Sequence, residues 1–286
     1  MDSVGDVVNR MVDNAISEGN RNEVVGEDDF YFDGLLYCGK CGMRKERYIT
    51  LFNRVTKKVQ VMCACAETKY YEDQKKQKEE EERRYLESLR INSLMDVRYE
   101  DATFEKAIID SGNKTNMGLC QRYVDKFQEF YENNQGLIMY GDVGTGKSFA
   151  AACIANSLLG NGTSVVMTSF VKVLELIGSR TSDETEIISR INNAKLVIFD
   201  DLGAERKTDY ALEKVFDIID SRYRLKRPMI FTTNLDINDM AQEEDIRYKR
   251  IFDRIFEVCY PVEFKGGSWR KNGGKGKWDN LTGGIL

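Results

Sequence analysis

Histidine is absent from this sequence of 286 residues. Without an imidazole, any general base must be a carboxylate, and any protein zinc site must use cysteine or carboxylate ligands. No hydrophobic run approaches the length of a membrane span, so we expect no membrane partner. The start of the sequence, Met1 to Asp6, lacks the basic flank and apolar stretch of a secretory signal. We therefore expect a cytoplasmic protein.

An excess of basic residues is also missing, because 42 Lys and Arg face 47 Asp and Glu and give a formal net charge of -5. This charge argues against a protein that coats duplex DNA by bulk electrostatics, although a local basic groove remains compatible with it. A cytosolic location also argues against disulfides, so the seven cysteines are expected to be thiols or metal ligands. The length allows one well-buried domain and a smaller one.

The stretch from Gly136 to Ser148 joins a buried-strand pattern to the nucleotide-binding spacing G-x-x-x-x-G-K-[ST]. Its glycines allow backbone angles closed to other residues, so that successive N–H groups can converge on phosphates at the positive end of the next helix. We expect Lys147 to reach the β- and γ-phosphates and the Ser148 hydroxyl to ligate Mg²⁺. The candidate nucleotide-binding residues are Gly141, Asp142, Val143, Gly144, Thr145, Gly146, Lys147, Ser148 and Phe149.

Two further apolar stretches end in polar residues. Leu196 to Phe199 is followed by Asp200, which is expected to hold Mg²⁺, and by Asp201, which is expected to orient the attacking water and act as its base. A later apolar stretch ends at Asn234, our candidate for positioning water near the γ-phosphate. The alternative for Asn234 is a turn residue that ends a strand.

Arg250 and Arg254 are four residues apart and share one face of a predicted helix. Two guanidiniums aimed at phosphate would stabilise charge in a transition state, one at its own nucleotide and one at a neighbouring subunit's. Surface solubility is the competing explanation for both side chains.

The motifs GDVGTGKS, LVIFDDLGAE, SRY and FTTNL, with RIFDRI and VEFKGGSWRK, resemble the DnaC/DnaI/IstB branch of the AAA+ ATPases over residues 98–271. The resemblance implies an α/β fold of three layers, α/β/α, with a parallel sheet of strand order 5-1-4-3-2. A reduced lid fits the short stretch after Asn234. The same alternation of strands and helices is predicted by the apolar pattern, with strands near 136–140, 164–168, 195–200, 228–233 and 258–264 and helices over 119–131, 149–159 and 209–224.

Family membership also implies residue roles and ATP as the nucleotide. It maps the first sensor onto Asn234, the trans-acting arginine finger onto Arg250 and the second sensor onto Arg254, and it places Phe104 near the adenine. AAA+ proteins most often have glutamate at the position of Asp201. The shorter side chain shifts the attacking water, so we expect an ATP hydrolase that is slow.

Two cysteine pairs precede this region, Cys38 with Cys41 and Cys63 with Cys65. Their spacing matches a tetrathiolate zinc knuckle closed by a hairpin. Four thiolates would close the coordination shell, so the zinc would be structural and the module too small to fold without it. Buried, unligated thiols are the alternative.

Composition divides the chain into four predicted parts. Residues 1–70 form an N-terminal helix and a zinc module for docking a partner, 71–97 a charged linker helix, 98–265 the ATPase domain, and 266–286 a flexible basic tail. The apolar stripe of the N-terminal helix, over residues 4–16, either docks a partner or packs on its own domain. In the tail, Trp269 and Trp278 either stack on nucleic-acid bases or belong to a disordered segment.

Helicase loaders of the DnaI type resemble this layout of a zinc module before an AAA+ domain. We therefore predict an ATP-dependent loader of the hexameric replicative helicase onto single-stranded DNA, whose subunits associate through their ATP interfaces. Candidate DNA contacts are Lys172, Arg206 and Lys207. The alternatives are an IstB-like transposition helper that remodels duplex DNA, and a nucleotide-bound adaptor that does not hydrolyse ATP.

Overall fold

The computed structural model describes residues 25–50, 56–179, 183–206 and 208–269. The predicted helix over residues 4–16, Lys207 and Trp278 lie outside these ranges. The chain divides into two compact units, Met1–Arg83 and Arg84–Leu286. Among the described residues, every helix is too short or too polar to cross a lipid bilayer.

The first unit contains two antiparallel hairpins and the start of a long helix. Strand β1 (Phe30–Phe32) pairs with β2 (Leu35–Tyr37), and β3 (Glu46–Thr50) pairs with β4 (Thr56–Gln60). Helix α2 (Ala64–Asn92) begins directly after Cys63 and continues into the second unit, so the predicted charged helix exists and starts earlier than expected. The buried apolar residues described in this unit are Leu35, Leu36, Cys38 and Cys63.

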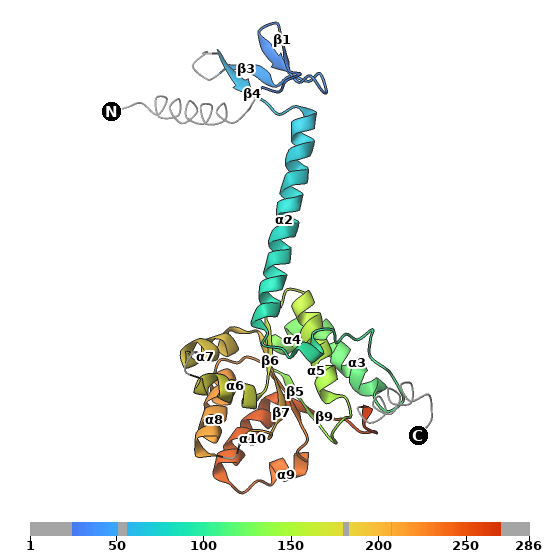
Figure 1. The fold of residues 1–286 in the computed structure, drawn as a ribbon, viewed down its shortest axis with the longest axis vertical. Helices are drawn as coiled ribbons and strands as arrows, with labels where there is room; N and C mark the ends of the chain where they lie inside the picture. The colour runs from blue at the N-terminus through green and yellow to red at the C-terminus, as the bar shows by residue number, and fades with distance from the viewer. Residues whose placement is uncertain (1–24, 51–55, 180–182, 207, 270–286) are drawn as a thin grey trace, which may run out of the picture. The chain divides into compact units, whose positions relative to one another are not determined.

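The second unit is built on a five-stranded sheet (Figure 1). Its strands lie in the order β6-β7-β8-β5-β9, and each neighbouring pair is parallel. With β5 as the first strand, this is the predicted order 5-1-4-3-2, which is confirmed. The strands are β5 (Gly136–Tyr140), β6 (Val165–Thr168), β7 (Leu196–Leu202), β8 (Met229–Thr233) and β9 (Cys259–Glu263).

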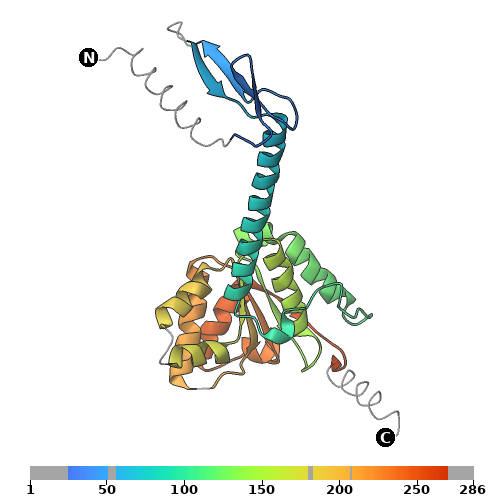
Figure 2. The same cartoon turned by 45° about the horizontal axis from the view of Figure 1, so that its top comes forward.

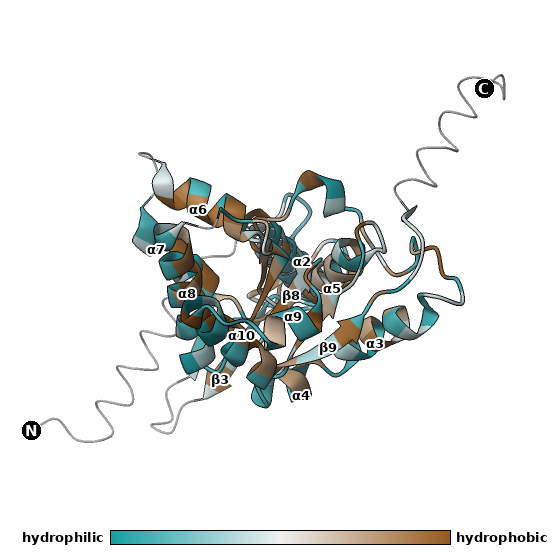
Figure 3. Ribbon diagram, turned by 90° about the horizontal axis from the view of Figure 1, so that it is seen from below, coloured by the Kyte–Doolittle hydropathy of each residue, from teal (hydrophilic) through white to brown (hydrophobic). Residues whose placement is uncertain are grey.

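Helices cover both faces of the sheet, as Figures 1 and 2 show from two directions. Helices α3, α4 and α5 pack on the face that carries Leu137 and Met139, while α6, α7, α8 and α10 pack on the face that carries Ile138. Helices α6 and α8 carry both hydrophobic and hydrophilic residues (Figure 3). The bounds are η1 Val97–Tyr99, α3 Lys114–Asp125, α4 Phe127–Glu132, α5 Lys147–Gly160, α6 Phe170–Gly178, α7 Glu184–Asn193, α8 Asp209–Arg224, α9 Ile237–Ala241 and α10 Ile246–Val258.

One predicted helix, over residues 119–131, is two helices in the structure. The chain leaves the helical conformation at Lys126, with φ −111° and ψ 22°, and this residue ends α3 and begins α4. The turn allows the rings of Tyr123 and Phe130 to stack with centroids 4.7 Å apart. Local propensity does not mark this break, because the stacking that accompanies it is a tertiary contact.

Candidate functional site

The loop of residues 141–148, called the phosphate loop below, connects β5 to α5 at the carboxyl ends of the strands. Gly146 begins α5 with φ +97°, and Gly141 has φ +128°, conformations that favour glycine. Lys147 is buried, and its ammonium group donates to the carbonyl oxygens of Gly141 and Asp142, each at 2.8 Å. The loop therefore closes around its own lysine.

The same ammonium group connects the phosphate loop to the neighbouring strand. Lys147 Nζ lies 2.9 Å from Oδ1 of Asn234, which follows the end of β8. Because β5 pairs in parallel with β8, with Tyr140 opposite Thr233, the ends of the two strands meet at one edge of the sheet. Asn234 thus lies beside the lysine of the phosphate loop, and its role in positioning water stays a prediction.

The two aspartates lie at a distortion of β7. The register between β7 and β8 shifts between Phe199 and Leu202, and Asp201 adopts the left-handed conformation with φ +57°. Thr232 stabilises the distortion with one hydroxyl, which accepts from the Asp201 backbone N–H at 2.9 Å and donates to Asp200 Oδ1 at 2.6 Å. Asp200 is thereby fixed in orientation, and Asp201 is left with an exposed carboxylate.

A cavity of about 320 Å³ joins these groups. This volume lies at the small end of the range for ligand pockets. Residues 143–148 of the phosphate loop, Asp201 and Asn234 line it, and further apolar side chains form a part that suits a nucleobase. The apolar lining residues are Tyr99, Ala107, Ile108, Met117, Phe149, Phe264 and Trp269.

Phe104, expected near the adenine, is not among the described residues that line the cavity. Its ring packs against the hydrophobic core that contains α3 and α5, while Ala107 and Ile108 line the cavity in its place. Within the segment Tyr99 to Phe104, Tyr99 rather than Phe104 lines the cavity, and the place of Phe104 near the adenine stays a prediction. The chain is irregular between η1 and α3, so sequence spacing does not indicate which side chain faces inward.

The two predicted arginines lie on α10, outside the described lining of the cavity. Arg254 donates to Asp220 on α8 at 2.7 Å, and its guanidinium lies 4.6 Å from the centroid of the Phe216 ring. These contacts give Arg254 a packing role in this structure and leave the sensor assignment without support from geometry. Arg250 is exposed, as a residue that reaches a neighbouring subunit must be.

Two of the candidate DNA contacts are described. Lys172 donates to the carbonyl oxygen of Leu94 at 2.9 Å, and therefore helps to hold the chain after α2. Arg206 is exposed between β7 and α8. Lys172 is half-buried, whereas Arg206 is exposed.

Arg222 lies within the SRY motif and is fully buried, which no pattern in the sequence predicts. Its guanidinium donates to the carbonyl oxygens of Ala194 at 2.6 Å, Pro228 at 2.7 Å and Ile191 at 3.1 Å. Burial lowers the pKa of Arg222 to about 9, so the group remains charged at neutral pH. The arginine joins the end of α7 to the starts of β7 and β8, the strands that deliver Asp200, Asp201 and Asn234.

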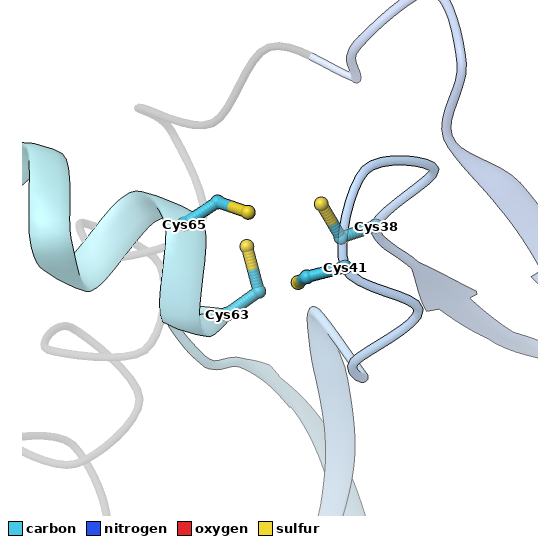
Figure 4. Close-up of side chains that lie close together, drawn as sticks. All are labelled: Cys38, Cys41, Cys63 and Cys65. Atoms are coloured by element: carbon cyan, nitrogen blue, oxygen red, sulfur yellow. The ribbon is translucent and has the colours of Figure 1, made fainter.

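In the first unit, the four predicted cysteines meet, and their side chains point toward one another (Figure 4). The four Sγ atoms all lie within 4.8 Å of one another, and thiolates around tetrahedral zinc lie about 3.8 Å apart. Cys38 and Cys41 come from the loop after β2, while Cys63 and Cys65 lie at the start of α2. Four sulfurs this close together could hold one tetrahedral ion.

Hydrogen bonding prepares one of these sulfurs for a metal. Backbone N–H groups of Met43 and Cys65 lower the pKa of the Cys41 thiol to about 6. The hydrogen bond to Cys41 raises the pKa of Cys65 to about 11, because one negative charge among four sulfurs disfavours a second. A divalent cation would relieve this repulsion and favour all four thiolates.

A glycine-lined phosphate loop and an acidic pair at the same edge of a parallel sheet define a P-loop protein that binds nucleoside triphosphates. Residues 67–275 match the family of IstB-like ATP binding proteins, and the chain belongs to this family. The resemblance to the DnaC/DnaI/IstB branch is confirmed by relatives that carry the name of replicative helicase loader.

The chain is 23% identical over 179 residues to the replicative helicase loader DnaI of Bacillus subtilis, a match that covers 58% of this chain and 57% of that protein. It is 27% identical over 163 residues to the loader DnaC of Escherichia coli, covering 55% of this chain and 64% of DnaC. The chain thus spans about three fifths of the length of these curated relatives.

The fold also resembles solved structures. A crystal structure of DnaI superposes with a TM-score of 0.52 at 24% identity, and the match covers 62% of this chain and 97% of that one. A putative primosome component from Streptococcus pyogenes gives a TM-score of 0.51 at 22% identity, covering 61% and 91%. Both comparisons support the fold described above.

Proposed function

We propose that this protein is an ATP-dependent loader that places a hexameric replicative helicase on single-stranded DNA. The proposal rests on the observation that Lys147, Asn234 and Asp201 meet at one cavity. The curated relatives of the chain are named replicative helicase loaders. The nucleotide is ATP, because the family is described as ATP binding.

The side chains have distinct roles in this proposal. Lys147 exchanges its bonds to the loop carbonyls for the β- and γ-phosphates, and the Ser148 hydroxyl with the Thr232-oriented Asp200 offers oxygen ligands of the type that Mg²⁺ prefers. Bound Mg²⁺ would neutralise charge on the phosphates. Asp201 accepts the proton of the attacking water, and the Asn234 amide helps to hold that water.

Arg250 is the group that this proposal assigns to a neighbouring subunit's nucleotide. It is exposed on α10, and ATP bound between subunits would make self-association depend on nucleotide. Arg206 is the described residue that the proposal keeps as a contact to single-stranded DNA.

The second part of the proposal is that the helicase docks on the unit that contains the cysteine cluster. Cys38, Cys41, Cys63 and Cys65 would hold a structural zinc ion and fix the two hairpins of the first unit. We assign the contact with the helicase to this unit because the unit lies outside the sheet that holds the nucleotide site.

A helicase pulldown tests the loader function directly. The intact protein is expected to retain the host's purified replicative helicase in the presence of ATP, and a Cys38→Ser/Cys41→Ser variant is expected to lose it. Lys40→Ala is the matched control, because Lys40 lies between the two ligands and is exposed. If the intact protein does not retain helicase, the loader proposal is wrong, whereas the assignment of the nucleotide site is unaffected.

The transposition helper is the second candidate, favoured by the description of the matching family as IstB-like. It predicts ATP-dependent filaments on duplex DNA and no affinity for helicase, which electron microscopy and the same pulldown distinguish. A nucleotide-bound adaptor predicts that phosphate release does not exceed that of Lys147→Ala, with or without single-stranded DNA.

A further inference from the structure

The segment after the edge strand β9 runs along the phosphate loop. The Phe264 N–H donates to the carbonyl of Tyr140 at 2.8 Å, which continues the pairing of β9 with β5 to the start of the loop. From the other side, Asn116 on α3 donates to the carbonyl of Glu263 at 2.7 Å. The start of the segment is therefore held by both the sheet and a helix.

The segment then approaches the phosphate loop at three of its glycines, in the order of the sequence. A Cβ on Gly141 would lie 2.3 Å from the carbonyl oxygen of Phe264, and a Cβ on Gly144 would lie 2.2 Å from the Ser268 hydroxyl. The third contact is at Gly146, where a Cβ would lie 3.8 Å from the Trp269 ring. The segment thus packs on the loop with its backbone at Gly141 and with the side chains of Ser268 and Trp269 at Gly144 and Gly146.

Gly144 is not one of the fixed positions of the nucleotide-binding spacing, which are Gly141, Gly146, Lys147 and Ser148. The structure gives it two other reasons to be glycine, its φ of +88° and the approach of Ser268. In addition, the Trp269 N–H donates to the Gly144 carbonyl at 3.0 Å. This bond uses a carbonyl of the loop and none of the N–H groups that serve phosphate.

The indole of Trp269 is half-buried and lines the same cavity as Lys147, Ser148 and Asp201. Ala107, Ile108 and Met117 line the same cavity, so a ligand bound there would meet apolar side chains besides the indole. An indole can stack on any nucleobase and can also cover a ribose. The sequence offered a disordered tail or stacking on nucleic acid for Trp269, and neither places it at this cavity.

We propose that the segment from Phe264 to Trp269 is a wall of the nucleotide site, and that the Trp269 indole covers the base and sugar of the bound nucleotide. This inference rests on the proposed nucleotide function, and it assigns to Trp269 a binding role that the motifs do not. Because the segment is anchored on the loop itself, nucleotide binding and the position of the chain after β9 are linked.

Tryptophan fluorescence tests the placement, because the chain has only two tryptophans. In a Trp278→Phe variant, the emission of Trp269 is expected to change in a saturable way on addition of Mg-ADP. Calorimetry on the same variant measures binding independently, and Lys147→Ala is expected to abolish both signals. If Mg-ADP binds in the calorimeter while the emission stays constant, Trp269 does not cover the nucleotide.

Affinity provides the second test. Trp269→Ala is expected to weaken binding of Mg-ADP about tenfold, whereas Trp269→Phe, which keeps an aromatic face, restores most of the affinity. Tyr260→Ala is the matched control, since Tyr260 is an exposed aromatic residue on β9 that does not line the cavity. Thermal unfolding of each variant checks that the second unit remains folded.

The outcomes separate the two proposals. If the intact protein binds no nucleotide in the calorimeter, both the nucleotide function and this inference are wrong. If it binds nucleotide and Trp269→Ala binds as tightly as the intact protein, only the inference is wrong. Tighter binding by Trp269→Ala would also contradict it, because the indole would then obstruct the site.

Discussion

Asp201 illustrates how one backbone conformation selects a residue. Its φ of +57° belongs to the left-handed region, which aspartate and asparagine enter more readily than longer side chains. A glutamate at this position would carry a cost for the same conformation. The aspartate, which departs from the most frequent AAA+ residue, is therefore consistent with the distorted end of β7.

Asp201→Asn keeps this conformational preference and removes the carboxylate. In the proposed mechanism, we expect steady-state phosphate release to fall about 100-fold, the lower range for loss of a general base. Nucleotide affinity is expected to change little, because the asparagine still fits the cavity edge. Phosphate release and calorimetry measure the two quantities, and an unchanged rate of release would show that Asp201 is not the base.

We expect Arg222 to act on stability rather than on chemistry, because it is buried and bonds to backbone carbonyls. Removing it leaves the buried carbonyls of Ala194 and Pro228 without their donor, so Arg222→Ala is expected to lower the free energy of unfolding by about 3 kcal/mol or more. Arg224→Ala, at an exposed position of the same helix, is expected to change it by less than about 0.5 kcal/mol. Urea denaturation of both variants checks the contrast, and equal losses would contradict it.

At the scale of elements, the parts that the sequence predicts best are those with local signals. The strands are buried apolar runs, and the phosphate loop has fixed spacing, so both were predicted at nearly their observed positions. The missed features depend on contacts between distant segments. Arg222 reaches carbonyls on other elements, and Trp269 reaches the loop only because β9 lies next to β5.

Helix α8 has the bounds that the sequence predicts, and the residue that caps it can be tested at this scale. Its N-cap is Thr208, whose hydroxyl accepts from the Ala211 N–H at 3.2 Å. Thr208→Ala is expected to lower the free energy of unfolding of the second unit by about 1 kcal/mol. Thr208→Ser, which keeps the oxygen, should lose only a fraction of this. Denaturation midpoints measure both, and equal losses for the two variants would argue against a capping role.

At the scale of the whole molecule, the two units are stabilised by different means. The second unit has an extensive core on both faces of its sheet, whereas few described residues of the first unit are buried and apolar. A small core contributes little stabilisation by itself, so hairpins of this size generally need a further constraint. The cysteine cluster can supply that constraint if it holds zinc.

Metal removal tests this division of stability. A strong zinc chelator is expected to abolish hydrogen-exchange protection in β3 and β4, while β5 and β8 keep theirs, because zinc binding and folding of a small module are coupled. Cys38→Ser/Cys41→Ser should show the same loss without chelator, and Lys40→Ala should show none. Zinc content by mass spectrometry accompanies each measurement. Protection of β3 and β4 that survives complete removal of zinc would mean that the first unit folds by its own contacts, and that the thiols are not structural ligands.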